Sequence, residues 1–293
     1  MTMKIGMTVP SMIAGLDRAA ILDWCRRIDE GPWSTLAIGE RIAYPNIELF
    51  TSLAAAAAVT ERVRLMATVV VAPAHPAIEV AKMAATIDVL SDGRLDLGIG
   101  VGGRDEDYRA LERPFGRRHQ RLDDQVEVMR RVWSGAEPGP DLHPVGPPPV
   151  QAGGPPLYSG ALGPKAIARS ARWATGIAGF LLDPLGEDVA GGFARIESAW
   201  QDAGRSEAPR HVTSFWYALG DGAREDLHAY ARRYLGIFGD DLASVMADSC
   251  TVHSVDALRA AVDRLADAGC DELLLVPTTS DPRHLDEVAE LLP

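Results

Sequence analysis

Cysteine is scarce in this chain, and the few cysteines do not form pairs. Among 293 residues only Cys25, Cys250 and Cys270 are cysteines, and none of them stands in a C-x-x-C spacing. An odd number of widely separated thiols excludes a disulfide framework and is typical of buried thiols in a reducing compartment. We therefore expect a cytoplasmic protein.

Basic charge is also in short supply. Lysine and arginine together number 29 against 41 aspartates and glutamates, which gives a formal net charge of −12. No cluster of basic residues is interleaved with aromatic residues, as a nucleic-acid surface would require. The composition therefore argues against a nucleic-acid partner.

Long apolar runs are absent as well. The longest, SLAAAAAV at 52–59, is far shorter than the roughly 20 residues that span a bilayer. The opening residues MTMKIGMTVP carry one lysine and no long apolar segment, which does not fit a secretory signal. We expect no membrane association.

The usual motifs of metal and nucleophile chemistry are lacking. The sequence contains no H-E-x-x-H, no paired cysteine ligands and no G-x-S-x-G elbow, and its histidines are scattered singly. No metal site is expected.

What the sequence does contain is an alternation of β-rich runs and helical patterns. Strands are predicted at 3–9, 34–39, 63–71, 94–100, 156–160, 175–182, 210–219 and 271–276. Helices are predicted at about 15–30, 46–60, 76–91, 119–134, 163–174, 185–203, 223–247, 254–268 and 283–292. Eight strands of this kind predict an α/β fold, a single (β/α)8 TIM-type barrel domain over 1–293. An open doubly wound sheet is the alternative, because a strand count does not prove closure.

Two segments exceed a minimal barrel. Residues 101–118 follow the fourth strand, and residues 135–155 precede the fifth. The second segment has seven prolines and five glycines, too many for a helix or a central strand. It is either an ordered excursion or a mobile lid, and we expect both segments to select the substrate.

Gly98, Gly100 and Gly103 spell G-x-G-x-x-G, the pattern of a dinucleotide-binding turn. That turn belongs at the first strand of a βαβ unit and leads directly into a helix. Here three βα units come first, and the residues that follow are acidic and interrupted by Pro114. We reject the dinucleotide interpretation, and the glycines instead fit the carboxyl end of a barrel strand.

The same region carries a resemblance to a known family. LSDGRLDLGIGVGG and DYRALERPFGRRHQRLDDQVEVMRRVW, with VRLMATVVVAPAHPAIEVAKMAATIDVLS before them and GPKAIARSARWATGI after them, resemble the luciferase-like monooxygenase superfamily. Weaker similarity at IGER and AGCDELLLVP extends the resemblance over most of the chain. It implies a TIM-type barrel that holds FMN or the deazaflavin F420 at its carboxyl-terminal mouth.

The resemblance also implies where the cofactor lies. Relatives have a non-prolyl cis peptide in the third strand, which matches Thr68–Val69, and they hold the cofactor phosphate at the segment that matches YSGALGPKA. The expected cofactor-binding residues are Ala67, Thr68, Val69, Gly100, Gly102, Ser159, Gly160, Ala161, Leu162, Gly163 and Lys165. Replacing Gly160 with Val is expected to weaken cofactor binding while the barrel stays folded.

Candidate catalytic residues are few. Glu40 and Arg41 match a position where relatives have an acid followed by histidine, and His75 matches the HP dipeptide of the family. The alternative to a catalytic role is a structural ion pair at the barrel rim for Glu40 and Arg41, and a strand end for His75.

Trp216 and Tyr217 lie on opposite faces of one strand, so only one of them can line the mouth.

The expected function is hydride transfer with F420 on an unidentified small organic substrate. One alternative is an FMN-dependent monooxygenase that takes reduced flavin from a separate reductase, and another is a barrel that binds a flavin or deazaflavin without catalysis. A homodimer is possible, because relatives commonly associate.

Overall fold

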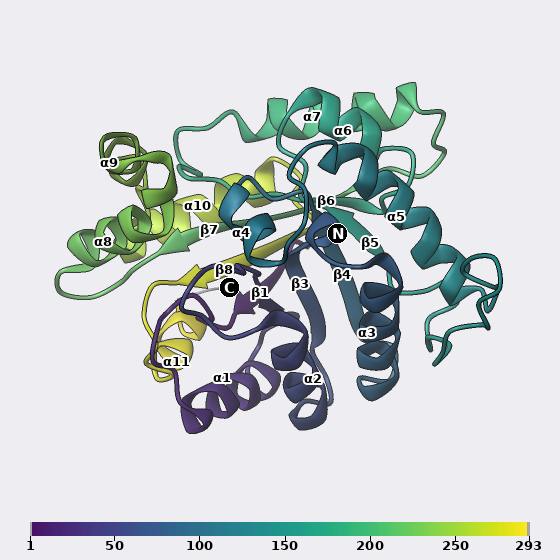
Figure 1. Cartoon of the computed structure of the whole chain (residues 1–293). Helices are drawn as coiled ribbons and strands as arrows, with labels where there is room; N and C mark the ends of the chain where they lie inside the picture. The colour runs from purple at the N-terminus through teal and green to yellow at the C-terminus, as the bar shows by residue number, and fades with distance from the viewer. Residues whose placement is uncertain (1, 292–293) are drawn as a thin grey trace.

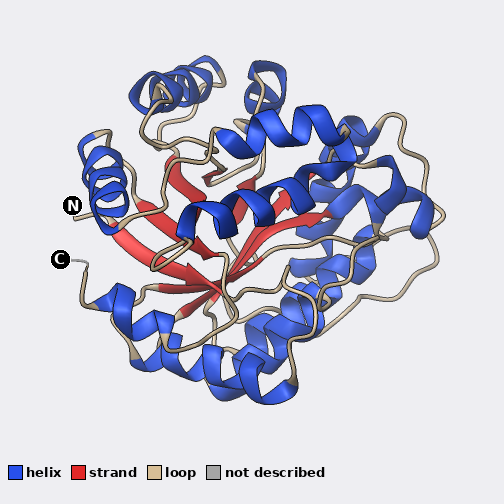
Figure 2. Ribbon diagram, turned by 90° about the vertical axis from the view of Figure 1, so that its left-hand side faces the viewer, coloured by secondary structure: helices blue, strands red, loops and turns tan. Residues whose placement is uncertain are grey.

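The computed structural model describes residues 2–291 and forms a closed barrel of eight parallel strands (Figures 1 and 2). Each strand pairs with the next in sequence, and β8 (Glu272–Pro277) pairs back onto β1 (Lys4–Thr8) over four residue pairs, from Lys4 with Glu272 to Met7 with Leu275. The open-sheet alternative is therefore wrong, and the predicted barrel is confirmed.

All eight predicted strands are present. They are β1, β2 (Thr35–Ile38), β3 (Arg64–Val71), β4 (Leu95–Gly100), β5 (Leu157–Ser159), β6 (Gly176–Ala178), β7 (Arg210–Tyr217) and β8. The helices that cover them are α1 (Arg18–Glu30), α2 (Leu49–Val59), α3 (Ala77–Leu90), α4 (Asp105–Ala110), α5 (Arg118–Trp133), α6 (Pro164–Ser170), α7 (Val189–Asp202), α8 (Ala223–Leu235), α9 (Asp240–Asp248), α10 (Val255–Asp267) and α11 (His284–Ala289). Two short 3-10 turns, η1 (Ala72–Ala74) and η2 (Gly236–Phe238), complete the elements.

Two element predictions need correction. The single helix expected at 223–247 is three pieces, α8, η2 and α9, because Gly239 adopts φ +89° and ends the helical backbone. Strand β6 ends at Ala178, four residues before the predicted end, so Gly179 to Leu182 form a loop that runs on at the barrel mouth.

The segment 135–155 lies at the opposite end of the barrel from the mouth. It has no helix or strand, and it joins α5 to β5 at the amino ends of the strands. Gln151 ties it down: its backbone N–H donates to Asp88 Oδ2 (2.9 Å), and its side-chain amide donates to Leu95 O (2.6 Å) at the start of β4. The segment is therefore not a lid and does not select a substrate at the mouth.

Residues that point into the barrel form three layers. Side chains alternate along each strand, and the middle layer is the apolar set Ala37, Met66, Tyr158, Val212 and Leu274. Two residues earlier on the strands lies a polar layer, Thr35, Arg64, Asp96, Arg210 and Glu272. Two residues later come Gly39, Thr68, Gly160, Ser214 and Val276, which line a cavity at the mouth.

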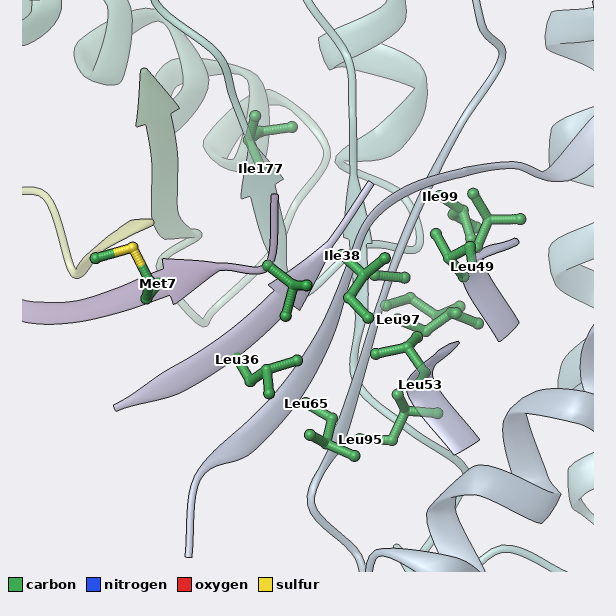
Figure 3. Packing of buried hydrophobic residues seen from close by; sticks show 14 of the residues in the cluster. Met7, Leu36, Ile38, Leu49, Leu53, Leu65, Leu95, Leu97, Ile99 and Ile177 are labelled. Carbon is green, nitrogen blue, oxygen red and sulfur yellow. The ribbon is translucent and has the colours of Figure 1, made fainter. Parts of the chain in front are cut away.

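The main hydrophobic core lies outside the barrel, between strands and helices. Outward residues such as Leu36, Leu65 and Leu97 pack with Leu49 and Leu53 of α2 (Figure 3). This is why the strands are apolar on both faces in the sequence. Residues that follow the carboxyl ends of the strands do not take part in this strand–helix packing, so they can form a binding site.

Candidate cofactor and substrate site

Two cavities open at the carboxyl ends of the strands. The first, of about 490 Å³, lies over the barrel axis, and the second, of about 610 Å³, lies beside it between β4, β5, α5 and α6. Val69, Gly160 and Leu162 line both cavities, so the two volumes meet at the ends of β3 and β5.

Val69 forms the ledge between the cavities. The peptide bond Thr68–Val69 is cis, as the family resemblance implied, and the pairing of β3 with β4 shifts between Ala67 and Val70. A Cβ atom built on Gly100 or on Gly160 would lie 2.9 Å from Cγ2 of Val69, closer than packing allows. Glycine is required at both positions because the Val69 side chain fills the space.

This packing changes the expectation for Gly160. A side chain at this position meets Val69 before it meets any ligand. Replacement therefore acts on the ledge itself, and an effect on cofactor binding would come through Val69.

The other expected cofactor-binding residues mostly surround the second cavity. Gly100, Gly102, Ser159, Gly160, Ala161, Leu162, Gly163 and Lys165 line it, and Thr68 lines the first. Ala67 lines neither cavity, because strand alternation turns it outward into the core, where it is fully buried. The hydroxyl of Ser159 is engaged with Ser170 Oγ at 2.6 Å.

Sequence reasoning missed a second group that lines the second cavity. Arg118 and His119 at the start of α5 lie there, together with Arg169 and Trp173. Arg118 Nε and Trp173 Nε1 are buried without a hydrogen-bond partner among residues 2–291. Burial lowers the pKa of His119, and the positive charges of Arg118 and Arg169 lower it further. The GRRHQR run is the sequence signal, although alone it resembles a solvated helix start.

The walls of the first cavity are aromatic on one side. Trp216 lies at the centre of this wall. Its ring centroid is 4.6 Å from that of Phe180, 5.7 Å from that of Tyr230 and 5.1 Å from that of Tyr234, and each pair packs edge to face. Tyr217 points the other way, into the core. The structure thus decides which of the two strand residues faces the mouth.

Two polar side chains of the first cavity, Ser214 and Glu187, are engaged by backbone groups. Ser214 Oγ donates to Gly179 O (3.1 Å). Glu187 Oε1 accepts from the backbone N–H groups of Leu182 (2.9 Å) and Asp183 (3.0 Å). Ser11 Oγ is buried without a partner in the described part of the chain. Ser11 is therefore a hydroxyl available to a ligand that enters the cavity.

Glu40 and His75, two of the candidate catalytic residues, line neither cavity. Glu40 accepts a hydrogen bond from the Val71 backbone N–H (2.6 Å) and pairs with His75 Nε2 (3.0 Å). The carbonyl of His75 in turn accepts from Gln125 Nε2 (2.7 Å) on α5. This network fastens the loops after β2 and β3 together, which is a positioning geometry.

Arg41, the third candidate, also lies outside both cavities. It is buried and pairs with Glu106 Oε1 at 3.1 Å, so the alternative of an ion pair between Glu40 and Arg41 does not hold. Its guanidinium lies over the ring of Tyr44, 4.1 Å from the centroid.

Residues 2–291 contain neither a metal-binding cluster nor a membrane-spanning helix. No group of His, Cys, Asp or Glu side chains is arranged to hold a metal ion. None of the helices is both long enough and apolar enough to cross a membrane.

Comparison with known proteins agrees with this geometry. Among curated proteins, the chain is 31% identical over 219 residues to an uncharacterized protein of Mycobacterium tuberculosis, which covers 64% of this chain and 74% of that protein. It is 40% identical over 93 residues to the pyrimidine monooxygenase RutA of Methylorubrum extorquens, covering 30% of this chain and 25% of RutA.

Solved structures share the fold at low identity. An F420-dependent secondary alcohol dehydrogenase, in complex with an F420–acetone adduct, matches with a TM-score of 0.83 at 16% identity, over 99% of this chain and 98% of that one. The oxygenating constituent of 3,6-diketocamphane monooxygenase from Pseudomonas putida, in complex with FMN, matches with a TM-score of 0.73 at 15% identity, over 99% and 97%. The family model of luciferase-like monooxygenases matches residues 3–273, and the chain belongs to this family.

Proposed function

We propose that this protein is an oxidoreductase that binds F420 across its two cavities and transfers hydride to or from a small organic substrate in the first. The observation that carries the proposal is the junction at Val69 and Gly160, where an apolar cavity on the barrel axis meets a cavity lined by cationic side chains. An elongated molecule with a flat ring at one end and negative charge at the other fits both volumes.

The first cavity suits the flat ring of the cofactor because glycines and small side chains line part of it. Gly39, Gly160 and Gly179 line the first cavity beside Val69, so a planar ring can approach the strand ends closely. A bound deazaflavin supplies the atom that donates or accepts hydride. The protein contributes a rigid ledge, apolar walls that exclude water, and the Ser11 hydroxyl as an unengaged hydrogen-bonding group.

The second cavity supports F420 over FMN by its charge. Arg118, Lys165 and Arg169 all line it, and within residues 2–291 only Arg169 forms an ion pair there, with Asp123. FMN ends in one phosphate, whereas F420 continues beyond its phosphate into carboxylates. Two unpaired cations and two unpartnered N–H groups are suited to the longer anion.

The FMN-dependent monooxygenase is the second candidate function. It is favoured by the FMN-bound structural neighbour and by the RutA match at 40% identity over 93 residues. The chain spans only a quarter of RutA, so its activity does not carry over directly.

Fluorescence titration of the purified protein with each cofactor separates these functions. We expect F420 to bind at least ten-fold more tightly than FMN. Tighter binding of FMN would contradict the F420 assignment and support the monooxygenase, and binding of neither cofactor would contradict the proposed function.

A variant pair tests the junction itself. In Gly160→Ala, the added Cβ pushes Val69 toward the cavities, where the cofactor would have to push it back. A cost of about 1–3 kcal/mol on binding corresponds to a loss of about five-fold to more than 100-fold in cofactor affinity. Gly116→Ala is the control, because a Cβ there meets nothing within 4 Å and Gly116 lines neither cavity. Equal cofactor affinity in both variants would remove the ledge from the binding site.

A further inference from the structure

We infer that the substrate of this protein is an apolar, flat molecule that carries one anionic group, and that Arg104 binds this group at the rim of the first cavity. That this ligand is the substrate rests on the proposed function, whereas the binding of an anion is argued from Arg104 and its neighbours alone. Arg104 is the cation that lines the first cavity.

Arg104 is held in place without being neutralised. Its Nη2 donates to the carbonyl oxygen of Tyr234 (3.4 Å), and its guanidinium lies 4.7 Å from the centroid of the Tyr234 ring. It forms no ion pair with any carboxylate among residues 2–291, and its Nε is buried without a hydrogen-bond partner. An aromatic ring positions a guanidinium but leaves its donors free for an anion.

A second guanidinium increases the positive potential at this rim. Arg41 Nη1 donates to the same Tyr234 carbonyl (3.4 Å), so two arginines converge on one oxygen atom. Glu106 pairs with Arg41 but not with Arg104. Burial lowers the pKa of Arg41, and the charge of Arg104 lowers it further. A ligand anion at Arg104 would relieve this repulsion.

The remaining carboxylates near the rim are committed elsewhere. Asp107 accepts from the backbone N–H groups of Ile42 (3.1 Å) and Ala43 (2.8 Å), and Asp105 pairs with Arg109. Glu187, the acid that lines the first cavity, is held by two backbone N–H groups. The cavity lining therefore holds one cation, Arg104, and one carboxylate, Glu187, whose Oε1 atom is engaged by backbone N–H groups.

The other residues of the first cavity indicate the shape and polarity of the rest of the substrate. Its walls are the rings of Phe180, Trp216 and Tyr230, with Leu235 and Phe238 on the same side. Edge-to-face contacts fix Trp216 in place, so a flat ligand can pack against a preformed surface.

The test compares two probes of the same shape on the cofactor-free protein. Isothermal titration calorimetry is performed with naphthalene carboxylate and naphthalene carboxamide. We expect the carboxylate to bind about ten-fold or more tightly than the amide, because a hydrogen bond to a charged group exceeds one between neutral groups. Equal affinity of the two probes would overturn the inference.

Variants assign the difference to a residue. Arg104→Met should reduce carboxylate affinity to that of the amide and leave amide affinity unchanged, and Arg104→Lys should keep part of the preference. Arg109→Met is the matched control, since Arg109 is on the next helix turn and exposed. A preference that persists in Arg104→Met would overturn the assignment. If that variant does not fold, Arg104→Lys decides, because a preference as large as that of Arg109→Met would then overturn the assignment.

A failure of this inference can be distinguished from a failure of the proposed function. Loss of F420 binding in Arg104→Met with no probe preference in the parent protein would place Arg104 on the cofactor and overturn the inference alone. A clear probe preference in a protein that binds neither F420 nor FMN would sustain the inference and refute the proposed function alone.

Discussion

At the scale of single residues, strand alternation separates site from core. Thr68 faces the first cavity, whereas its neighbour Ala67 is packed against helices, and Trp216 and Tyr217 divide in the same way. The period of two is visible in the sequence, but its phase is not, because helix-covered strands are apolar on both faces.

The pair of Glu40 and His75 gives a prediction at this scale. Burial lowers the pKa of His75, but the hydrogen bond and charge of Glu40, with smaller contributions from Glu79 and Glu48, outweigh burial and raise it above its ordinary value of 6.5. The folded state therefore holds this proton more tightly than the unfolded state. The resulting stabilisation is present in full below about pH 6.5 and is lost as the pH rises through the raised pKa.

Urea unfolding across this pH range tests the pair. His75→Gln retains an N–H donor but does not titrate, so its free energy of unfolding should lose the part of the decline above about pH 6.5 that His75 causes. His143→Gln, at an exposed position, is the control. If the pH profile of His75→Gln matched that of the parent protein, the pair would not be the origin of the decline.

At the scale of elements, the broken helix after β7 shapes the first cavity. Helix α8, the turn η2 and helix α9 contribute Leu235, Phe238 and Met246 to its wall. A continuous helix, as the sequence pattern predicts for 223–247, would not bend these side chains toward the mouth. The glycines at 236 and 239 are the visible signal, and their backbone angles show that only Gly239 has φ above zero.

Replacing these two glycines should have opposite effects. Gly239 has φ +89° and ψ 151°, a conformation that is almost restricted to glycine, so Gly239→Ala should lower the free energy of unfolding by about 1–3 kcal/mol. Gly236 is helical, with φ −54°, and a Cβ there meets nothing within 4 Å. Gly236→Ala should be neutral or stabilise by up to about 1 kcal/mol. Chemical denaturation of both variants gives the comparison, and equal changes would contradict it.

At the scale of the whole molecule, the barrel keeps stability and binding at opposite ends. The polar layer at the amino ends closes the barrel with an internal network: Arg64 Nη2 donates to Asp96 Oδ1 (2.7 Å), and Thr35 Oγ1 donates to Glu272 Oε1 (2.5 Å). Both cavities lie at the carboxyl ends, beyond the apolar middle layer. The segment 135–155 belongs to the closed end.

This division predicts a change in stability without a change in binding. Asp96→Asn removes the charge from a buried ion pair with Arg64 and should lower the free energy of unfolding by about 1–3 kcal/mol. Its affinity for F420 or FMN should equal that of the parent protein, because no residue of this layer lines either cavity. Asp105→Asn, in an exposed pair with Arg109, should change stability by less than about 0.5 kcal/mol. Weakened cofactor binding in Asp96→Asn would refute the separation of the two ends.

The sequence by itself determined the class of fold, the eight strands and the glycine-rich segments that line the second cavity. These features depend on local patterns, namely alternating strand and helix formers and runs of small residues, which one stretch of chain displays. The tertiary structure alone decided closure, the phase of each strand and the end of the barrel at which 135–155 lies. It alone brought Arg41, Arg104 and Tyr234 together from three distant segments, because such contacts depend on how the barrel closes and no local pattern encodes them.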